Sequence, residues 1–434
     1  MELKKYKLGD LAQVTRGASL SGEYYATQGN YIRLTCGNFD YRNNCFKENQ
    51  SKNNIYYTGG FKEEFLLERG DIITPLTEQA IGLLGSTARI PESGKYIQSQ
   101  DIAKIDCNES LLDKDFAFYL ISSACVKKQL SAAAQQTKIR HTSPDKIKEC
   151  TVWIPSLDVQ KRIGRILTGI DNKIAINRQI NDNLEAMAKQ LYDYWFVQFD
   201  FPNEEGKPYK SSGGVMVWNE KLKREIPQGW SVSNVKSLIE PIERGISYSS
   251  DDLLDPFATP MINLACFSKA GDYRLGEMKF FSGKVSNDKL ISPMDMLIAC
   301  TDMTQGADII GRPILASDEY DQYTFSTDLA LITPKGKFKM YLYYTLRTPF
   351  YHKYIRPFAS GTTVKHLNLI GVENYGLPVP PIEIQSKFEE LITPIKEKQS
   401  KNLNEINALT KQRDELLPLL MNGQATINYH LSDD

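Results

Sequence analysis

Two long stretches of the chain repeat apolar residues at alternating intervals of three and four positions. The first begins near Ile154 and ends near Phe196, and the second begins after Pro380 and Pro381. This spacing is typical of the seam of a coiled coil and predicts two long helices. The apolar positions are Ile163, Ile166, Ile170, Ile180, Leu184, Met187 and Leu191 in the first stretch, and Ile392, Ile395, Ile406, Leu409, Leu416 and Leu420 in the second.

The sequence also indicates where each helix begins. Each pattern opens after proline, which is tolerated before or within the first turn of a helix but not inside it. An acid, Asp158 or Glu383, then lies where it favours the positive end of the helix dipole. Roughly 35 to 40 residues at 1.5 Å each give a helix of about 50 to 60 Å. A helix of that length needs a partner along its seam, and each stretch is the obvious partner of the other.

The two stretches belong to a longer internal repeat. Residues 157–160 match residues 382–385 at an offset of 225, and the same offset relates Asn177 to Asn402. It also holds upstream, where Thr137, Ile139, Arg140 and His141 match Thr362, Val364, Lys365 and His366. Looser matches relate Arg16-Gly17 to Arg244-Gly245, 70–73 to 294–297 and 99–103 to 326–330. The period is too long for a solenoid repeat. The chain therefore consists of two copies of one unit, and each copy is a domain followed by a long helix.

Each domain is predicted to mix strands and helices. In the first, four short β-like runs separated by turn residues precede an amphipathic helix over 115–130, whose counterpart in the second covers about 339–356. The predicted organisation is a first domain over 1–152, a helix over 153–201, a linker over 202–225 with a turn at Gly213-Gly214, a second domain over 226–379, a helix over 380–425 and a tail over 426–434. The β-like runs are 31–35, 71–76, 85–90 and 102–105.

Composition narrows the class of protein. A chain of 434 residues with 41% hydrophobic and 24% charged residues can bury two or three cores. It shows no run of 18 apolar residues and no positively charged apolar leader, and its seven cysteines lack Cys-x-x-Cys pairs, so we expect a cytoplasmic protein that does not span a membrane. The net charge of −1 means that binding to nucleic acid would need basic residues gathered on one face, or another subunit's help.

Polar loops at matching places in the two domains are the candidate nucleic-acid contacts. Lysine and arginine suit phosphates or guanine edges, and glutamine and asparagine suit adenine edges. The main candidates are Arg16, Ser19, Lys138, Arg140 and His141 in the first domain and Arg244, Ser247, Lys365, His366 and Asn368 in the second; Thr77 with Gln79, and Thr304 with Gln305, follow comparable strands and are weaker candidates. Two alternatives remain open: the polar side chains cap the following turn, or the two histidines are buried and hold the loop.

Two further features concern packing. Asn177 and Asn402 lie on the helix seams, where buried polar residues can fix the register of a coiled coil; the alternative is that both face solvent or a partner subunit. The aromatic cluster over 192–201 is typical of a core or a subunit interface rather than a ligand site.

Taken together, these motifs closely resemble the specificity subunit of Type I restriction-modification enzymes (HsdS). The motifs are the Pro-x-x-x-x-Gln helix openings, Trp195-Phe196, the restart at 226–230 and the terminal run 416–423. The resemblance implies an α+β fold, with two tandem mixed α/β target-recognition domains separated by two long helices that form an antiparallel coiled coil with a pseudo-two-fold axis. It further implies double-stranded DNA and two modification subunits as partners, and usually two restriction subunits.

The resemblance assigns the cofactors to those partners. S-adenosylmethionine is expected on the modification subunits, which methylate adenine, and ATP and Mg on the restriction subunits, with none bound by this chain. Two differing domains on a helix pair would read an asymmetric bipartite target, with the helices setting the spacing between half-sites. The partner subunits are expected to dock on the helices, the aromatic junction and the tail after Leu416.

Catalysis by the chain itself finds little support in the sequence. It lacks a Gly-x-x-x-x-Gly-Lys-Ser/Thr loop and an Asn/Asp-Pro-Pro-Tyr/Phe motif, and its four histidines have no metal-ligand spacing. Asp272, Glu277 and Lys279 resemble a nuclease triad only faintly. We therefore predict a DNA-recognition subunit without catalysis. The competing hypothesis is a coiled-coil scaffold without sequence-selective DNA binding.

Overall fold

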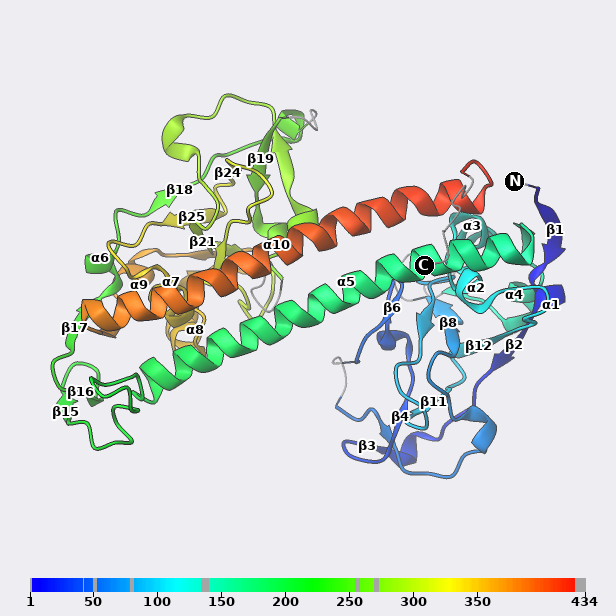
Figure 1. Ribbon diagram of the computed structural model, residues 1–434, viewed down its shortest axis with the longest axis horizontal. Helices are drawn as coiled ribbons and strands as arrows, with labels where there is room; N and C mark the ends of the chain where they lie inside the picture. Colours follow the sequence, from blue (N-terminus) through cyan, green and yellow to red (C-terminus); the bar gives the residue numbers. More distant parts are fainter. Residues whose placement is uncertain are drawn as a thin grey trace. The chain divides into compact units, whose positions relative to one another are not determined.

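The computed structural model describes residues 2–41, 43–49, 53–78, 82–133, 140–253, 258–268 and 273–425. The chain forms two compact units, each holding one mixed α/β domain and a part of each long helix. Unit 1 comprises Met1–Asn172 with Leu409–Asp434, and unit 2 comprises Lys173–Ala408 (Figure 1).

Both predicted long helices are present. Helix α5 covers Leu157–Tyr192, which is 36 residues, and helix α10 covers Ile382–Met421, which is 40 residues. At 1.5 Å per residue they are roughly 54 and 60 Å long. A single π-helical turn, Asp193–Val197, extends α5 into the aromatic cluster. In unit 2 the two helices run antiparallel, since Asn177 meets Glu405 and Glu185, further along α5, meets Lys396, which is earlier on α10.

Helix α10 departs from the rule that excludes proline from helix interiors. Pro394 and Pro418 both lie well inside it. Each removes one backbone donor, which leaves free the carbonyl four residues earlier. Both prolines are exposed, and so are Glu390 and Asp414, the residues that carry those carbonyls. Water can therefore satisfy the freed carbonyls, and the helix continues.

The repeated Pro-x-x-x-x-Gln pattern has a structural role at the start of each helix. The buried Gln160 side chain donates through Nε2 to the carbonyls of Pro155 at 2.9 Å and Leu111 at 3.0 Å. Its Oε1 accepts from the backbone N–H of Asp113 at 3.0 Å. Gln385, also buried, donates to the carbonyl of Pro380 in the same way. The glutamine thus ties the first turn of the helix to the chain that enters it.

The domain of unit 1 is built on a four-stranded sheet in the order β10-β8-β12-β2. A second sheet, in the order β11-β4-β7-β3, packs beside it, and all four predicted β-like runs contain a strand. The strands are β2 Ala12–Arg16, β3 Tyr25–Ala26, β4 Tyr31–Arg33, β7 Tyr56–Tyr57, β8 Ile72–Pro75, β10 Ala88–Arg89, β11 Tyr96–Ile97 and β12 Ile102–Cys107.

Unit 2 repeats this topology. Its main sheet has the order β23-β21-β25-β18, strand for strand the counterpart of the first. These strands are β18 Glu243–Arg244, β21 Met296–Ala299, β23 Pro313–Leu315 and β25 Leu329–Ile332. The same strand order in both units confirms that the 225-residue offset marks a duplicated fold rather than a chance similarity.

The predicted amphipathic helix is broken into two in both units, contrary to expectation. Unit 1 has α2 Lys114–Ile121 and α3 Ala124–Ala133, and unit 2 has α7 Lys339–Thr345 and α8 Pro349–Ile355. In unit 1 the Ser122 hydroxyl bonds to carbonyls of the preceding turn and competes with the helix. In unit 2 the Thr348 hydroxyl accepts from the N–H of Tyr351 and starts a new helix, with proline as its first residue.

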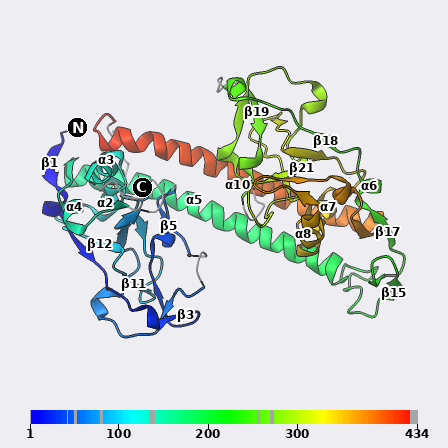
Figure 2. The ribbon, with the colours of Figure 1, turned by 180° about the vertical axis from the view of Figure 1, so that it is seen from behind.

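The segment predicted as a linker, 202–225, is folded onto unit 2. It contributes most of a hairpin, β15 Met216–Asn219 with β16 Arg224–Pro227, after a turn in which Gly213 has φ = 90°. Phe201 and Tyr209 stack with ring centroids 4.7 Å apart. Most of the aromatic cluster before it is buried in the core of unit 2, where the rings of Tyr192 on α5 and Tyr344 on α7 stack with centroids 5.8 Å apart. Figure 2 shows the C-terminal part of α5 beside α10 in this unit.

Candidate nucleic-acid interface

The sheet topology brings the predicted contact residues of each domain to one edge. On β12, Ala103 lies between Arg16 of β2 and Thr74 of β8. Because β12 is antiparallel to both neighbours, β2 and β8 run in the same direction, and the segments that follow them leave at the same edge. In unit 2, Ala330 lies likewise between Arg244 and Ile298. These edges are the ends of the sheets at which β2 and β8, or their counterparts β18 and β21, finish. We call them the recognition edges.

The repeated Arg-Gly pair at this edge has a steric explanation. A Cβ on Gly17 would lie 2.2 Å from the carbonyl oxygen of Gln98, and one on Gly245 would lie 2.2 Å from that of Phe325. Only glycine allows this close approach of two backbones. The chain turns along the edge as a result, which leaves Ser19 and Ser247 exposed just beyond it.

The two arginines of these pairs differ in environment. Arg16 is exposed, whereas Arg244 is half-buried beside the thiol of Cys300. Burial raises the pKa of the Cys300 thiol to about 11, although the positive charge of Arg244 opposes the rise. Arg16 is therefore freer to reach a ligand than its counterpart.

The second polar loop forms a short β-ladder at the recognition edge of each unit. In unit 1, β9 Thr77–Glu78 pairs with β13 Arg140–His141, so that Arg140 faces Glu78 and His141 faces Thr77. In unit 2, β22 Thr301–Asp302 pairs with β27 Lys365–Leu367, so that Lys365 faces Asp302 and His366 faces Thr301. Both histidines are exposed. This excludes the alternative in which buried histidines hold the loop.

Sequence reasoning missed the two acids of these ladders. Glu78 and Asp302 are 4% and 1% exposed. Oε1 of Glu78 accepts from the backbone N–H of Gly82 at 2.7 Å and Leu83 at 3.0 Å. The carboxylate of Asp302 accepts from the N–H of Thr304 at 2.6 Å and Ile309 at 2.7 Å. Each acid thus holds the polar loop that follows its strand.

A signal for these acids was present in the sequence. Thr77-Glu78 corresponds to Thr301-Asp302, since each pair lies opposite a basic residue and a histidine in its ladder. A Thr-acid pair directly after the second strand of each sheet could have been found.

Unit 2 also has a strongly basic pocket of about 710 Å³ beside its ladder. Six lysines and arginines, among them the predicted contact Lys365, line it together with His352 and the predicted contact Gln305. The six cations are Lys189, Arg312, Arg347, Lys353, Arg356 and Lys365. Burial lowers the pKa of His352, and the nearby Arg312 and Arg356 lower it further, although its bond to the Ala307 carbonyl works against the shift. A pocket of this charge favours an anion such as a phosphate.

The corresponding positions of unit 1 are less basic. At the offset of 225, serine replaces two of the arginines, since Ser122 matches Arg347 and Ser131 matches Arg356. Asp414 stands where unit 2 has Lys189. Two cations are retained, since Lys128 matches Lys353 and Arg140 matches Lys365, so part of the charge belongs to the repeat and the excess belongs to the second domain.

The remaining predicted contacts vary in their settings. Gln79 and Lys138 lie outside the described residues. Asn368 is exposed but accepts through Oδ1 from the N–H of Ile370 at 3.1 Å, so it caps the turn after the ladder, as one alternative foresaw. Thr304 accepts through Oγ1 from the N–H of Asp308 at 3.0 Å within the loop that Asp302 holds.

The two seam asparagines are both buried between the helices of unit 2. Asn177 donates to Glu405 at 2.8 Å, and Asn402 donates to Oδ1 of Asn181 at 2.9 Å. They are 7% and 3% exposed, so neither faces solvent. A role in fixing the register remains a prediction.

The comparison with known families agrees with this geometry. Residues 1–186 and 227–411 match the family model of the Type I restriction modification DNA specificity domain. The chain belongs to this specificity-domain family. The two matched segments are the two copies of the repeat, each comprising a domain and most of its long helix.

Two relatives are specificity subunits of Type I restriction enzymes, and a solved structure has the same fold. The chain is 25% identical to the MjaIX specificity subunit of Methanocaldococcus jannaschii, over 80% of the chain and 78% of that protein. It is 22% identical to the HindI specificity subunit of Haemophilus influenzae, over 97% and 99%. The crystal structure of a Type I S subunit from M. genitalium has the same fold, with a TM-score of 0.62 at 15% identity over 97% of this chain and 96% of that one.

Within the described part of the chain, no cluster of three or more histidine, cysteine and acidic side chains has an arrangement that could hold a metal ion. None of the helices there combines the length and apolar character needed to cross a membrane. Asp272 of the faint nuclease triad lies outside the described residues, and Lys279 packs over the ring of Tyr248.

Proposed function

We propose that this chain is the DNA-specificity subunit of a Type I restriction-modification enzyme, and that it recognises an asymmetric bipartite target with one half-site per domain. The observation that carries the proposal is the recognition edge, whose ladder of a Thr-acid pair opposite a basic-His pair occurs in both units, while the loops that follow the acids differ in sequence. The matching ladders present each edge to DNA in one manner. The differing loops give each edge its own sequence preference.

The exposed residues of the two edges suit this role. Arg16, Ser19 and His141 in unit 1, and Ser247 and His366 in unit 2, can donate hydrogen bonds to phosphates or base edges. A short β-ladder is narrow enough to enter the major groove, where the four base pairs differ in their donors and acceptors. The buried acids Glu78 and Asp302 fix the adjoining loops, which lowers the entropy cost of binding.

The basic pocket of unit 2 is proposed as a contact for the DNA backbone. The net charge of the chain is −1, so any attraction for DNA has to come from local clusters of cations. The pocket is such a cluster, and it adjoins the ladder through Gln305 and Lys365. Phosphate contacts there would position the second domain on its half-site without reading sequence.

We further propose that two modification subunits carrying S-adenosylmethionine bind this chain in the cytoplasm, and that restriction subunits supply ATP and Mg. The aromatic junction is an unsuitable docking surface, because Trp195 and Phe196 are 4% and 2% exposed. The helices are better suited. Ile176 and Met187 on α5 are 56% and 58% exposed, and Leu391 on α10 is 50% exposed. Exposed apolar residues on a helix are common protein contacts.

Methylation mapping tests the proposal. The chain would be expressed with its neighbouring modification subunit, and methyladenine located across the genome, with the modification subunit alone as control. We expect one split motif. Exchange of residues 1–152 for those of a relative should change one half of the motif and leave the other intact. A stable complex with the modification subunit that gives no motif would contradict the proposal and favour the scaffold hypothesis.

A further inference from the structure

An exposed methionine lies at the recognition edge of unit 2. Met303 directly follows Asp302, the last residue of β22. Its side chain is 72% exposed, which is the highest value among the large apolar side chains of the described residues. Single exposed apolar side chains are common on protein surfaces and need no function. The setting of Met303, rather than its exposure alone, therefore has to decide whether it has one.

The loop over 303–309 turns its other apolar side chains inward. Ala307 and Ile309 are 4% and 7% exposed. Met303 is thus the one apolar side chain longer than alanine's that this loop leaves in solvent, and it is also the one next to the ladder. An apolar side chain left outside at this place is available to a ligand of the recognition edge.

The backbone that carries this methionine is held on both sides of the loop. The two carboxylate oxygens of Asp302 accept from the N–H of Thr304 at 2.6 Å and of Ile309 at 2.7 Å. His352 of α8 bonds through Nε2 to the carbonyl of Ala307 at 3.0 Å. The loop is therefore in place before DNA arrives, and less entropy is lost when the exposed side chain makes a contact.

The neighbours of Met303 along the chain are both proposed DNA contacts. On one side is the ladder, in which Thr301 lies opposite the exposed His366. On the other side, Gln305 and the two residues after it line the basic pocket. If the ladder enters the major groove and the pocket holds the backbone, the methionine belongs to the segment that passes the base edges.

The major groove offers one kind of partner to such a side chain. Methionine has no hydrogen-bond donor and only a weak acceptor, so it cannot read the polar groups of the bases. The apolar group displayed in the major groove is the 5-methyl group of thymine, and apolar side chains recognise thymine by contact with it. The flexible, polarisable methionine side chain suits this contact. Apolar wedges between base steps, by contrast, enter from the minor groove.

We propose that Met303 recognises the methyl group of a thymine in the half-site of the second domain. This inference rests on the proposed function and names a residue that determines specificity within it. In the first domain the residue after the acid is Gln79, which suits an adenine edge rather than a methyl group. The two domains therefore differ in chemistry at the first position of the loop that follows the acid.

The test uses the complex of the full chain with its modification subunit, and duplexes that carry the mapped motif. The half-site of the second domain is the half that stays unchanged when residues 1–152 are exchanged. Each thymine of that half is replaced in turn by deoxyuridine, which keeps the hydrogen-bonding groups of thymine but lacks its methyl group. Binding titrations then compare the natural chain, Met303→Ala and Trp218→Ala. Trp218, which is 58% exposed on the hairpin of β15 and β16, provides the matched control.

The expected result is a loss of affinity that depends on Met303. The natural chain and Trp218→Ala should bind about 4-fold more weakly when one particular thymine is replaced, the value for one buried methyl group. Met303→Ala should bind the unmodified duplex more weakly and lose nothing further on that replacement. Deoxyuridine in the first half-site should affect all three proteins equally. Since the side chain of Met303 is exposed, Met303→Ala should keep the Tm of the natural chain.

Several outcomes would overturn the inference. The natural chain could bind equally well whichever thymine of the half is replaced, or Met303→Ala could retain the 4-fold loss. A second half-site without an A·T pair would also exclude the proposed contact, and so would a Met303→Ala chain that loses the modification subunit while its base preference stays the same. The proposed function fails separately, when the natural chain directs methylation to no motif; a split motif that ignores Met303 overturns this inference alone.

Discussion

At the scale of single residues, the positions that matter most at the recognition edges are those that constrain the backbone. Gly17 and Gly245 let the chain pass against a neighbouring carbonyl, and Glu78 and Asp302 hold the loops that follow. None of these four residues needs to touch DNA. They fix the positions of the exposed side chains that can.

We expect Gly17→Ala or Gly245→Ala to destabilise the protein by about 1–3 kcal/mol, because the added methyl group would lie 2.2 Å from a backbone carbonyl oxygen. Thermal unfolding would measure this as a lower Tm. Gly169→Ala is the matched control, for which we expect a change in stability of the opposite sign. It lies within α5 with nothing within 4 Å of the new Cβ, and should stabilise by about 0.5–1 kcal/mol. An unchanged Tm for both edge variants would refute the steric explanation.

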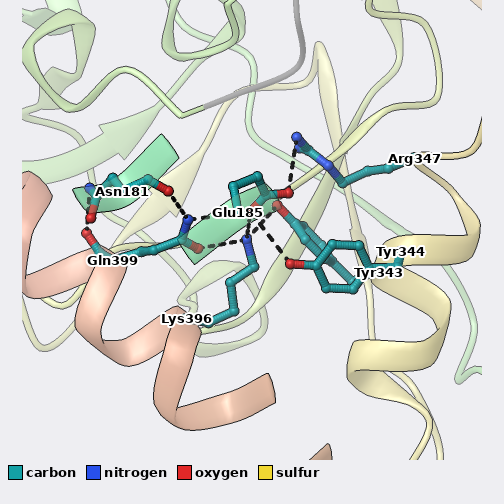
Figure 3. A network of polar contacts seen from close by, with 7 residues as sticks. All are labelled: Asn181, Glu185, Tyr343, Tyr344, Arg347, Lys396 and Gln399. Carbon is teal, nitrogen blue, oxygen red and sulfur yellow. Dashed lines mark hydrogen bonds and ion pairs between the residues drawn. The ribbon is translucent and has the colours of Figure 1, made fainter. Parts of the chain in front are cut away.

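At the scale of secondary-structure elements, the basic pocket and the ion pair of Glu185 and Lys396 each form where several elements meet. The basic pocket draws its cations from α5, α8, β27 and the chain between them. The ion pair of Glu185 and Lys396 joins α5 to α10, with α7 contributing Tyr344 (Figure 3). The ion pair forms only when α5 and α10 are antiparallel and in one register. The contacts of the buried asparagines on the seam require the same register.

The proposed role of the basic pocket predicts a change in salt dependence. Lys353→Ala and Arg356→Ala should each weaken DNA binding and reduce the slope of log affinity against log salt concentration by about 1, because each removes a phosphate contact. The methylated motif should stay the same. Binding titrations at several salt concentrations provide the measurement. Lys223 forms an exposed ion pair with Glu220 on the hairpin. Lys223→Ala is the control, and it should change neither the affinity for DNA nor the salt slope.

The network around Glu185 predicts acid sensitivity. The pKa of Glu185 is lower in the folded protein than its ordinary value of 4.5, so its stabilising effect is fully present above pH 4.5 and is lost as the pH falls through the folded value. We therefore expect Glu185→Gln to lower the free energy of unfolding at pH 7 and to differ less from the natural protein as the pH falls below 4.5.

Urea unfolding at a series of pH values measures that difference. Glu220→Gln, at an exposed pair with Lys223, is the control and should differ little from the natural protein at any pH. A Glu185→Gln difference that stayed constant across the series would contradict the assignment of the low pKa to this ion pair.

At the scale of the whole molecule, duplication gives the chain two domains of one fold and different surfaces. The difference extends from the loops to the charge, since two arginines of the basic pocket of unit 2 are serines in unit 1 and its Lys189 is matched by Asp414. Each domain should then recognise its half-site separately. Glu78→Gln should relax only one half of the methylated motif and Asp302→Asn only the other, because each carboxylate holds a loop of its own domain.

Methylation mapping of both variants with the modification subunit would show this separation. The doubly substituted chain should lose both halves. A single variant that relaxed both halves together would argue against one half-site per domain.

The sequence by itself determined the long helices, the duplication and the polar loops. Periodicity is a local property, and a helix of about 40 residues shows its apolar seam along the chain without reference to anything else. The 225-residue offset then linked Arg140-His141 to Lys365-His366, which the structure places in equivalent ladders. The break in the second domain could have been predicted, because Pro349 lies inside the expected helix and begins α8. The break in the first domain gave no such signal, since it lies at Ser122, whose hydroxyl bonds to carbonyls of the preceding turn.

Only the tertiary structure decided which distant residues act together. The pocket joins Lys189 to Arg356, and the ion pairs join Glu185 to Lys396 and Asp171 to Arg413. Burial also decided which acids have a structural role. Glu78 and Asp302 are two of the 53 acids in the sequence, and the fold buries them where they hold the loops of the recognition edges. The physical reason is that charge and hydrogen bonding act through space, over distances that sequence separation does not reveal.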